Sequence, residues 1–133
     1  MIYTLSIQTA NQTELKSITT EINKVIKKSG VKEGICIVYI PHTTAAVTIN
    51  EDADPSVKSD MLKELNKIIP FKDNYAHMEG NSAAHIKSTL VGNEQTIIIE
   101  NNRLLLGTWQ GVFFCEFDGP RSRKVIIKII PSN

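Results

Sequence analysis

The apolar run 34–40 constrains the fold of this chain more than any other stretch. Gly34 is followed by Ile, Cys, Ile, Val, Tyr and Ile, so both alternating faces of an extended chain carry apolar side chains. Such a run is typical of a central strand that is covered on both sides by other elements. Pro41 ends the run, because proline cannot donate to a sheet ladder. The sequence therefore predicts a central strand over 34–40, with His42-Thr43-Thr44 emerging at its end.

Periodicity elsewhere predicts more strands than helices. Residues 2–9 alternate between apolar and polar positions, as an amphipathic strand does. Apolar residues at helical spacing predict a first helix over 14–29, capped by Thr13 or Ser17 and ended by Gly30. The other expected elements are a helix from Asp54-Pro55 to Ile69, a short helix from Asn81 or Ser82 to Val91, and strands over 46–50, 96–100, 112–118 and 124–130.

This order of elements predicts an α+β fold. The helices do not alternate strictly with the strands, which argues against a doubly wound parallel sheet. With 133 residues, the chain is long enough for one domain that buries a proper core. We expect residues 1–133 to form a single compact domain with a largely antiparallel or mixed β-sheet, two main helices and one short helix.

Charge and composition exclude several classes of function. A formal net charge of +1 and the lack of a lysine or arginine cluster give no field that would gather nucleic acid or an anionic membrane. No segment approaches the roughly 20 apolar residues that span a bilayer, and the N-terminus lacks the pattern of a signal peptide. Cys36 and Cys115 lie in apolar, strand-like runs, which favours buried thiols over a disulfide. We therefore expect a cytoplasmic protein that binds neither nucleic acid nor membranes.

The three histidines are candidates for chemistry because all of them lie among polar residues. His77 and His85 stand on either side of Glu79 and Asn81, where a loop runs into the short helix, and His42 follows the central strand. His85 falls in the first helical turn, where the dipole disfavours imidazolium, and a metal ion requires neutral imidazole. Three imidazoles with an open fourth position are typical of a catalytic zinc site. The spacing His77-x7-His85 matches no established zinc motif, so surface or hydrogen-bonded histidines remain the alternative.

Three carboxylates are candidate catalytic groups. Glu79 could orient a histidine or act on a metal-bound water. Asp60 lies beside the apolar stripe of the second helix at about 100° per residue, so it could point into a cleft. Glu116 falls on the same strand face as Val112 and Phe114, where a carboxylate must find a partner.

Residues near the end of the chain are candidates for binding a phosphorylated substrate. Arg121 and Arg123 could each pair with Glu116 or bind a phosphate through the planar guanidinium fork. The glycines on each side of 108–110 allow close backbone approach, which suits a substrate pocket or a tight subunit contact. The full set of candidate substrate-binding residues is Arg121, Arg123, Asn50, Asn81, Thr108, Trp109 and Gln110.

Six short motifs follow one another along nearly the whole chain. They are Pro41-His42-Thr43-Thr44-Ala45, Thr48-Ile49-Asn50-Glu51, Ala53-Asp54-Pro55, His77-x-Glu79-Gly80-Asn81-x3-His85, Leu106-Gly107-Thr108-Trp109-Gln110-Gly111 and Glu116-Phe117-Asp118-Gly119-Pro120-Arg121. Together they resemble the YjbQ-like family, whose members are often named secondary thiamine-phosphate synthase enzymes. The resemblance implies a compact α+β domain that assembles as a homotrimer. It also implies a divalent metal, which we expect to be zinc, held by His42, His77 and His85.

The function expected from the residues and the resemblance is a metal-dependent enzyme that acts on a small phosphorylated metabolite. The family resemblance implies a weak joining of the pyrimidine and thiazole halves of thiamine phosphate, in which a cation and an arginine would stabilise the departing pyrophosphate. An all-histidine site suits zinc and water activation better than magnesium–pyrophosphate chemistry. The alternatives are therefore a zinc-type hydrolase such as a phosphatase, or a non-catalytic protein that binds a metal or a small anion.

Overall fold

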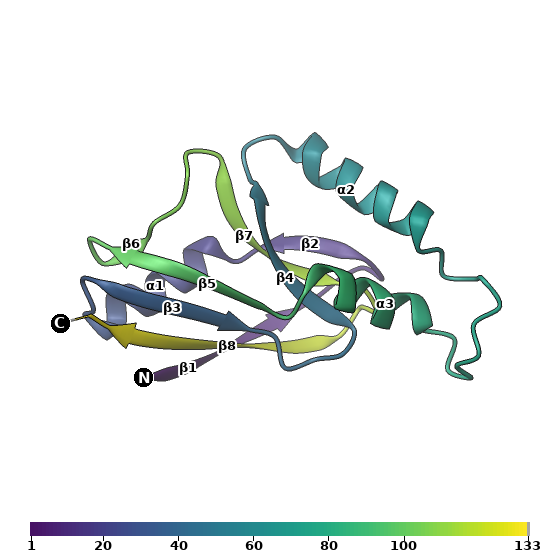
Figure 1. Cartoon of the computed structure of the whole chain (residues 1–133), viewed down its shortest axis with the longest axis horizontal. Coiled ribbons are helices and arrows are strands. Elements are labelled where there is room, and N and C mark those ends of the chain that lie inside the picture. The colour runs from purple at the N-terminus through teal and green to yellow at the C-terminus, as the bar shows by residue number, and fades with distance from the viewer. Residues whose placement is uncertain (133) are drawn as a thin grey trace.

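Eight strands and three helices form two sheets in the computed structural model, which describes residues 1–132. The elements, shown in Figure 1, are β1 (Ile2–Gln8), β2 (Glu14–Ser17), α1 (Thr19–Ser29), β3 (Gly34–Tyr39), β4 (Ala45–Glu51), α2 (Pro55–Ile68), α3 (Ser82–Val91), β5 (Glu94–Glu100), β6 (Arg103–Leu104), β7 (Gln110–Glu116) and β8 (Ser122–Pro131). One sheet has the order β1-β8-β3-β5-β6 and the other the order β2-β7-β4. All pairings within them are antiparallel, which confirms the predicted compact α+β domain.

The strand β3 lies in the middle of the five-stranded sheet, between β8 and β5, as predicted. Only one of its faces is covered, however. Cys36 and Val38 are completely buried, whereas Ile35 and Tyr39 on the other face are 41% and 42% exposed. The expectation of a strand covered on both faces is therefore wrong within this chain, because α1 packs against the inner face alone.

The element that is covered on both sides is the three-stranded sheet. Through Val47 and Phe114, one of its faces joins α1 and the five-stranded sheet in the main apolar cluster. Its other face contributes Phe113 and Cys115 to a second cluster, which α2 and α3 cover. Cys36 belongs to the main cluster, so the two thiols are free and buried in separate places, as predicted. Burial raises the pKa of both thiols to about 12.

The first helix is shorter than predicted. Residues Glu14–Ser17 form β2 and pair with β7, and α1 begins only at Thr19. Neither Thr13 nor Ser17 caps the helix, because no side chain bonds its first turn. The predicted end is confirmed, since Gly30 adopts the left-handed conformation, with φ of 76°, that closes many helices.

The second and third helices begin and end close to their predicted limits. The Asp54 side chain accepts a hydrogen bond of 2.9 Å from the Ser56 N–H, with Pro55 in the first turn of α2. The third helix, α3, runs from Ser82 to Val91 as predicted. Within residues 1–132, none of the helices has the length and apolar character needed to cross a membrane.

Candidate functional site

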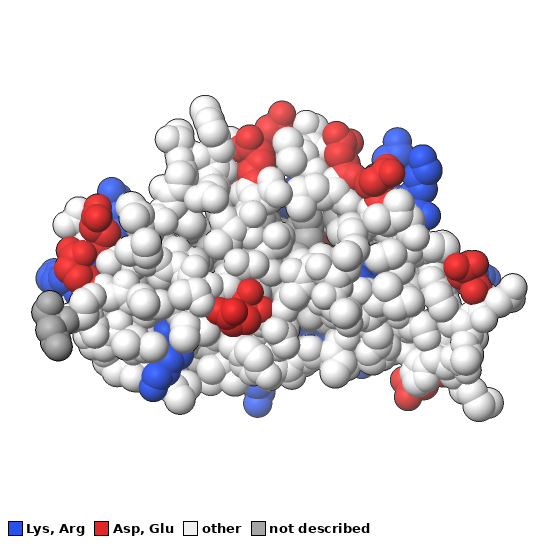
Figure 2. Space-filling view, in the orientation of Figure 1, with Lys and Arg blue, Asp and Glu red and all other residues white. Residues whose placement is uncertain are grey.

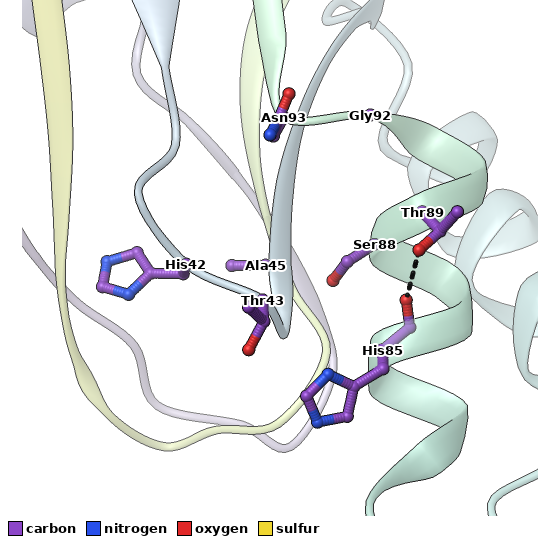
Figure 3. Close-up of a pocket in the computed structure, with 8 residues that line it drawn as sticks. All are labelled: His42, Thr43, Ala45, His85, Ser88, Thr89, Gly92 and Asn93. Atoms are coloured by element: carbon purple, nitrogen blue, oxygen red, sulfur yellow. Dashed lines mark hydrogen bonds between the residues drawn. The ribbon is translucent and has the colours of Figure 1, made fainter.

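A cavity of about 440 Å³ lies between α3 and the loop that joins β3 to β4. His42 and Thr43 line it from the loop, Ala45 from the start of β4, and His85 from α3. Figure 3 shows the two histidines on opposite sides of Thr43 and Ala45. The other lining residues are Ser88, Thr89, Gly92 and Asn93. Two of the three predicted histidines thus border one cavity, although they come from distant parts of the chain.

The spacing of polar residues on α3 explains the other wall of this cavity. Ser88 and Thr89 lie three and four residues after His85, so all three side chains share one helix face. The Ser88 hydroxyl donates 2.9 Å to the Ala84 carbonyl, and the Thr89 hydroxyl donates 3.0 Å to the His85 carbonyl. Each hydroxyl oxygen can still accept a hydrogen bond. Sequence reasoning missed Ser88 and Thr89, yet their spacing from His85 is the signal that would have found them.

A backbone hydrogen bond fixes the ring of His42. Its Nε2 accepts 2.9 Å from the N–H of Lys124, at the start of β8. A neutral ring that accepts at Nε2 carries its proton on Nδ1, so in this arrangement it has no lone pair left for a metal. Burial, together with the nearby Arg123 guanidinium, lowers the pKa of His42. Figure 3 shows the His42 ring turned away from His85.

His77 and His85 form a closer pair. Their rings meet edge to face, with centroids 5.7 Å apart and planes at 89°. The Oε2 of Glu79 lies 4.0 Å from the Nε2 of His77, at the surface of the loop before α3. A further cavity of about 410 Å³ is lined by both rings, together with Tyr75 and Ile86. Two imidazoles and one carboxylate thus lie near one another at the start of α3.

The three histidines do not converge on one point in the described chain. Among residues 1–132, no three histidine, cysteine, aspartate or glutamate side chains are grouped closely enough to hold a metal ion. His85 is shared between the cavity of His42 and the cavity of His77. A set of metal ligands that includes the Nε2 of His42 would require the hydrogen bond from the Lys124 N–H to break.

Glu116 and Arg123 neutralise one another in the protein interior. Glu116 is fully buried and Arg123 is 6% exposed. The Nε of Arg123 donates 2.8 Å to Glu116, and a terminal nitrogen of the same guanidinium bonds Glu116 and the Thr44 hydroxyl. Glu116 also accepts 2.7 Å from the Thr9 hydroxyl and 3.0 Å from the Asp118 N–H. Burial alone would raise the pKa of Glu116, but these donors outweigh it and hold the pKa below its ordinary value.

The candidate catalytic carboxylates therefore lie in three different environments. Both oxygens of Glu116 accept hydrogen bonds. Of the two arginines predicted as its partner, the structure pairs it with Arg123. Asp60 is exposed on the surface of α2. Glu79 lies 4.0 Å from a ring nitrogen of His77, and the charge of Glu116 acts on His42.

The turn after β7 adjoins the start of α3. Arg121 is exposed, and its guanidinium bonds the Asp118 carbonyl at 2.8 Å and the Asp118 carboxylate at 3.0 Å. Asn81 donates 3.0 Å to the same carboxylate from its Nδ2. Its Oδ1 is buried and, among the described residues, has no hydrogen-bond partner. A hydrogen-bond acceptor is thus left over beside the first turn of α3.

The remaining predicted residues lie at the far end of β4. Ala45 begins this strand beside the histidine cavity, and Glu51 at its other end pairs with Gln110 of β7. At about 3.3 Å per residue, seven residues separate the two ends by roughly 20 Å. Trp109 is 64% exposed there. Within one chain, the structure does not bring the following residues to the histidines: Asn50, Thr108, Trp109 and Gln110.

Known protein sequences match nearly the whole chain. A family model described as UPF0047 protein YjbQ-like matches residues 3–132. The UPF0047 protein MJ1081 of Methanocaldococcus jannaschii is 55% identical over 130 residues, which cover 98% of this chain and 94% of that protein. The UPF0047 protein YugU of Bacillus subtilis is 50% identical over 131 residues, or 98% of this chain and 99% of that protein.

Solved structures give the same assignment. The crystal structure of a YjbQ/UPF0047 family protein from Clostridium acetobutylicum has a TM-score of 0.94 and 52% identity, covering 96% of this chain and 99% of that one. A YbjQ-like protein of unknown function from Sulfolobus solfataricus also has a TM-score of 0.94, at 31% identity, covering 99% of this chain and 97% of that one. These names specify a family and a fold but no reaction. The chain belongs to the YjbQ-like UPF0047 family.

Proposed function

We propose that this protein is a metal-dependent enzyme that acts on a small phosphorylated metabolite in the cavity between His42 and His85. The observation that carries the proposal is the meeting of imidazole and hydroxyl groups around one cavity of about 440 Å³. That volume is within the range of small-molecule sites. The Thr43 hydroxyl could donate to a phosphate oxygen there, whereas Ser88 and Thr89 would first have to release the backbone carbonyls to which their hydroxyls donate.

His77 and His85 are the residues that would hold a cation, since their rings are in contact. Imidazole ligands favour zinc over magnesium. When bound, such a cation supplies Lewis-acid stabilisation of the negative charge that develops on a phosphate group. Glu79 would orient the His77 ring or accept a proton beside it. Of the two predicted arginines, Arg121 is the exposed candidate phosphate partner, although it would have to release Asp118 and does not line this cavity.

Two reactions fit this arrangement. Thiamine-phosphate synthesis comes from the family resemblance, whereas hydrolysis of a phosphate ester comes from the preference of imidazole for zinc. The two imidazoles at the cavity, with Glu79 beside His77 outside it, favour hydrolysis. A cytoplasmic location remains part of the proposal and agrees with the free, buried thiols of Cys36 and Cys115.

The proposal is tested by zinc titration of the purified protein, followed by activity assays. Calorimetry should show zinc binding that His85→Ala abolishes and His77→Ala weakens, while His42→Gln changes it little. Zinc binding that none of these variants alters would overturn the metal site.

The zinc-loaded protein is then assayed with both thiamine precursors and with a panel of phosphate monoesters. Turnover that is lost in His85→Ala supports an enzyme, and the preferred substrate decides between the synthase and the hydrolase. Full zinc occupancy without turnover of any of these compounds would instead favour the non-catalytic binding protein.

We also propose that the protein is a homotrimer, supported by the uncovered face of the five-stranded sheet. Ile35 pairs with Ile98 on one side and with Ile130 on the other, and Leu105 donates a hydrogen bond to the Ile98 carbonyl. These four side chains are between 41% and 58% exposed. Figure 2 shows the side on which β3, β5 and β8 lie in front of α1, and uncharged residues cover most of it. A contiguous apolar surface of this kind is typical of a subunit interface.

Light scattering after gel filtration measures the oligomeric state. The wild type should have three times the chain mass, and Ile98→Lys should shift it towards the monomer. Glu64→Lys, on the exposed side of the helix α2 that covers the other sheet, should not. A monomeric wild type would contradict the proposal.

A further inference from the structure

A separate cavity of about 500 Å³ lies between α1 and the turn that joins β5 to β6. Three basic side chains line it, Lys24 and Lys27 from α1 and Arg103 from β6, and no carboxylate does. Figure 1 shows α1 and β6 at one end of the molecule and α3, with His85, at the other. The remaining lining residues are Thr20, Asn23, Asn101 and Asn102.

Glu100, which pairs with Arg103 across β5 and β6, is the carboxylate that adjoins this basic cavity. Lys24 and Lys27 are three residues apart, so they share one face of α1. The ion pairs among residues 1–132 involve none of the three basic residues of the cavity. The chain as a whole carries a formal charge of only +1, so the basic group is a local concentration. Like charges gathered in a concave site attract an anion.

Hydrogen bonds hold the turn in place against the end of α1. The Nδ2 of Asn102 donates 2.6 Å to the Val31 carbonyl and 3.2 Å to the Ile26 carbonyl. Its backbone N–H donates 3.0 Å to the Lys32 carbonyl. Asn101 and Asn102 have φ of 54° and 61°, a left-handed conformation that asparagine tolerates better than most residues. The cavity wall formed by the turn is therefore fixed before any ligand arrives, which favours binding.

Asn23 supplies a hydrogen-bond donor to the same cavity. Its Oδ1 accepts 2.9 Å from the Leu104 N–H, which fixes the orientation of the amide. The Nδ2 group then faces away from that bond and, in the described chain, donates to no protein acceptor. An amide donor beside three cations is suited to a phosphate oxygen.

An adjoining cavity of about 300 Å³ extends this space. It shares Asn23, Asn101 and Arg103 with the basic cavity and continues along Leu104, Leu105 and Leu106. Glu100 lines it as well, and a carboxylate there can accept hydrogen bonds from hydroxyl or amino groups. The basic part thus suits an anion, and the adjoining part suits an organic group with apolar and hydrogen-donating portions.

We propose that the two adjoining cavities form a binding site for an organic phosphate of metabolite size. The phosphate lies among Lys24, Lys27 and Arg103, and the organic group lies along Leu106. This site is distinct from the histidine cavity, and its existence does not depend on the function proposed there.

The experiment is an amide NMR titration of the full chain with three probes: adenosine 5′-monophosphate, inorganic phosphate and adenosine. The nucleotide should cause saturable shifts at Asn23, Asn101 and Asn102, with inorganic phosphate binding more weakly and adenosine not binding. A double variant, Lys24→Gln with Lys27→Gln, should weaken nucleotide binding by about tenfold or more, since charge-assisted hydrogen bonds are lost. Lys28→Gln is the matched control, because this exposed lysine of α1 does not line the cavity.

Other outcomes would overturn the proposal. They are the absence of saturable shifts at these asparagines, equal binding by the double variant and the wild type, or inorganic phosphate binding as tightly as the nucleotide. An unchanged unfolding midpoint in both lysine variants shows that lost binding is not lost folding.

Discussion

Replacing Glu116 by glutamine tests how much the buried ion pair contributes to stability. The substitution keeps the shape of the side chain and removes its charge, so Arg123, which is 6% exposed, is left without a counter-charge. Removing one partner of a buried pair costs roughly 3–5 kcal/mol. The glutamine oxygen can still accept from the Thr9 hydroxyl or the Asp118 N–H, which places the expected loss near the lower limit. Against a typical total of about 5–15 kcal/mol, that loss is large.

The loss is measured by urea unfolding followed by far-ultraviolet circular dichroism at neutral pH. The double variant Glu116→Gln with Arg123→Met is the control, because it leaves no unpaired charge in the interior. It should be more stable than the single variant. A single variant that loses less than about 1 kcal/mol would refute the reasoning, since that is the size of an ordinary substitution.

The pH dependence gives a second check of the same pair. The pKa of Glu116 is lowered in the folded protein, so below the ordinary value of 4.5 the unfolded chain binds more protons than the folded chain. The stabilisation is therefore complete above 4.5 and is lost as the pH falls through the folded-state pKa. The difference in stability between the wild type and Glu116→Gln should shrink over that range. A constant difference would mean that the carboxylate charge is not the cause.

Two further substitutions test other buried features. Lys87 is fully buried, with its Nζ bonded to Asn66 and lying 4.7 Å from the centre of the Phe71 ring. Burial lowers its pKa, so charging it opposes folding, and Lys87→Met should match or exceed the wild type in urea unfolding at neutral pH. As the pH rises towards 10.5, the free energy of unfolding of the wild type should increase relative to that of this variant. A relative decrease would contradict the argument. A Cβ at Gly34 would overlap the Ile130 carbonyl, so Gly34→Ala should lose roughly 1–3 kcal/mol in the same assay, and an unchanged midpoint would disprove the clash.

Local sequence patterns predicted most elements of this fold, because most elements show one clear hydrophobic period or are bounded by a proline, a glycine or a capping residue. Asp54-Pro55 and Gly30 are examples in which one or two residues determine a helix end. The failure at Glu14–Ser17 has a physical cause. Leu15 is spaced to continue the apolar stripe of the helix, but the segment instead pairs with β7, and that pairing joins residues about 100 positions apart. A local period cannot report a partner so distant in sequence.

The prediction that both faces of β3 are covered was wrong for a related reason. An apolar run shows that both faces of a strand avoid water, but not what covers each face. Within the described chain, Ile35 and Tyr39 remain half exposed, and the homotrimer proposed above is one way to cover them. The sequence thus predicted the apolar character of both faces, but the prediction that both are covered is wrong within this chain.

The histidines could be identified as candidate site residues from the sequence, but their roles depend on hydrogen-bond partners that no sequence pattern reveals. The partner of His42 is the backbone N–H of Lys124, a group that every residue except proline possesses. The spacing of Ser88 and Thr89 from His85, in contrast, was readable, because i+3 and i+4 positions share a helix face. Side-chain spacing within one helix is therefore the more dependable guide to this site.

The ion pair connects the stability of the fold to the shape of the cavity. The Arg123 guanidinium that bonds Glu116 also bonds the Thr44 hydroxyl, and Thr44 directly follows the loop residues His42 and Thr43. The N–H that holds His42 belongs to Lys124, the residue after Arg123. The same short segment of β8 thus holds the histidine loop at two points. Family motif residues such as Glu116 are then needed to hold the loop and the His42 ring in place, even though they do not border the cavity themselves.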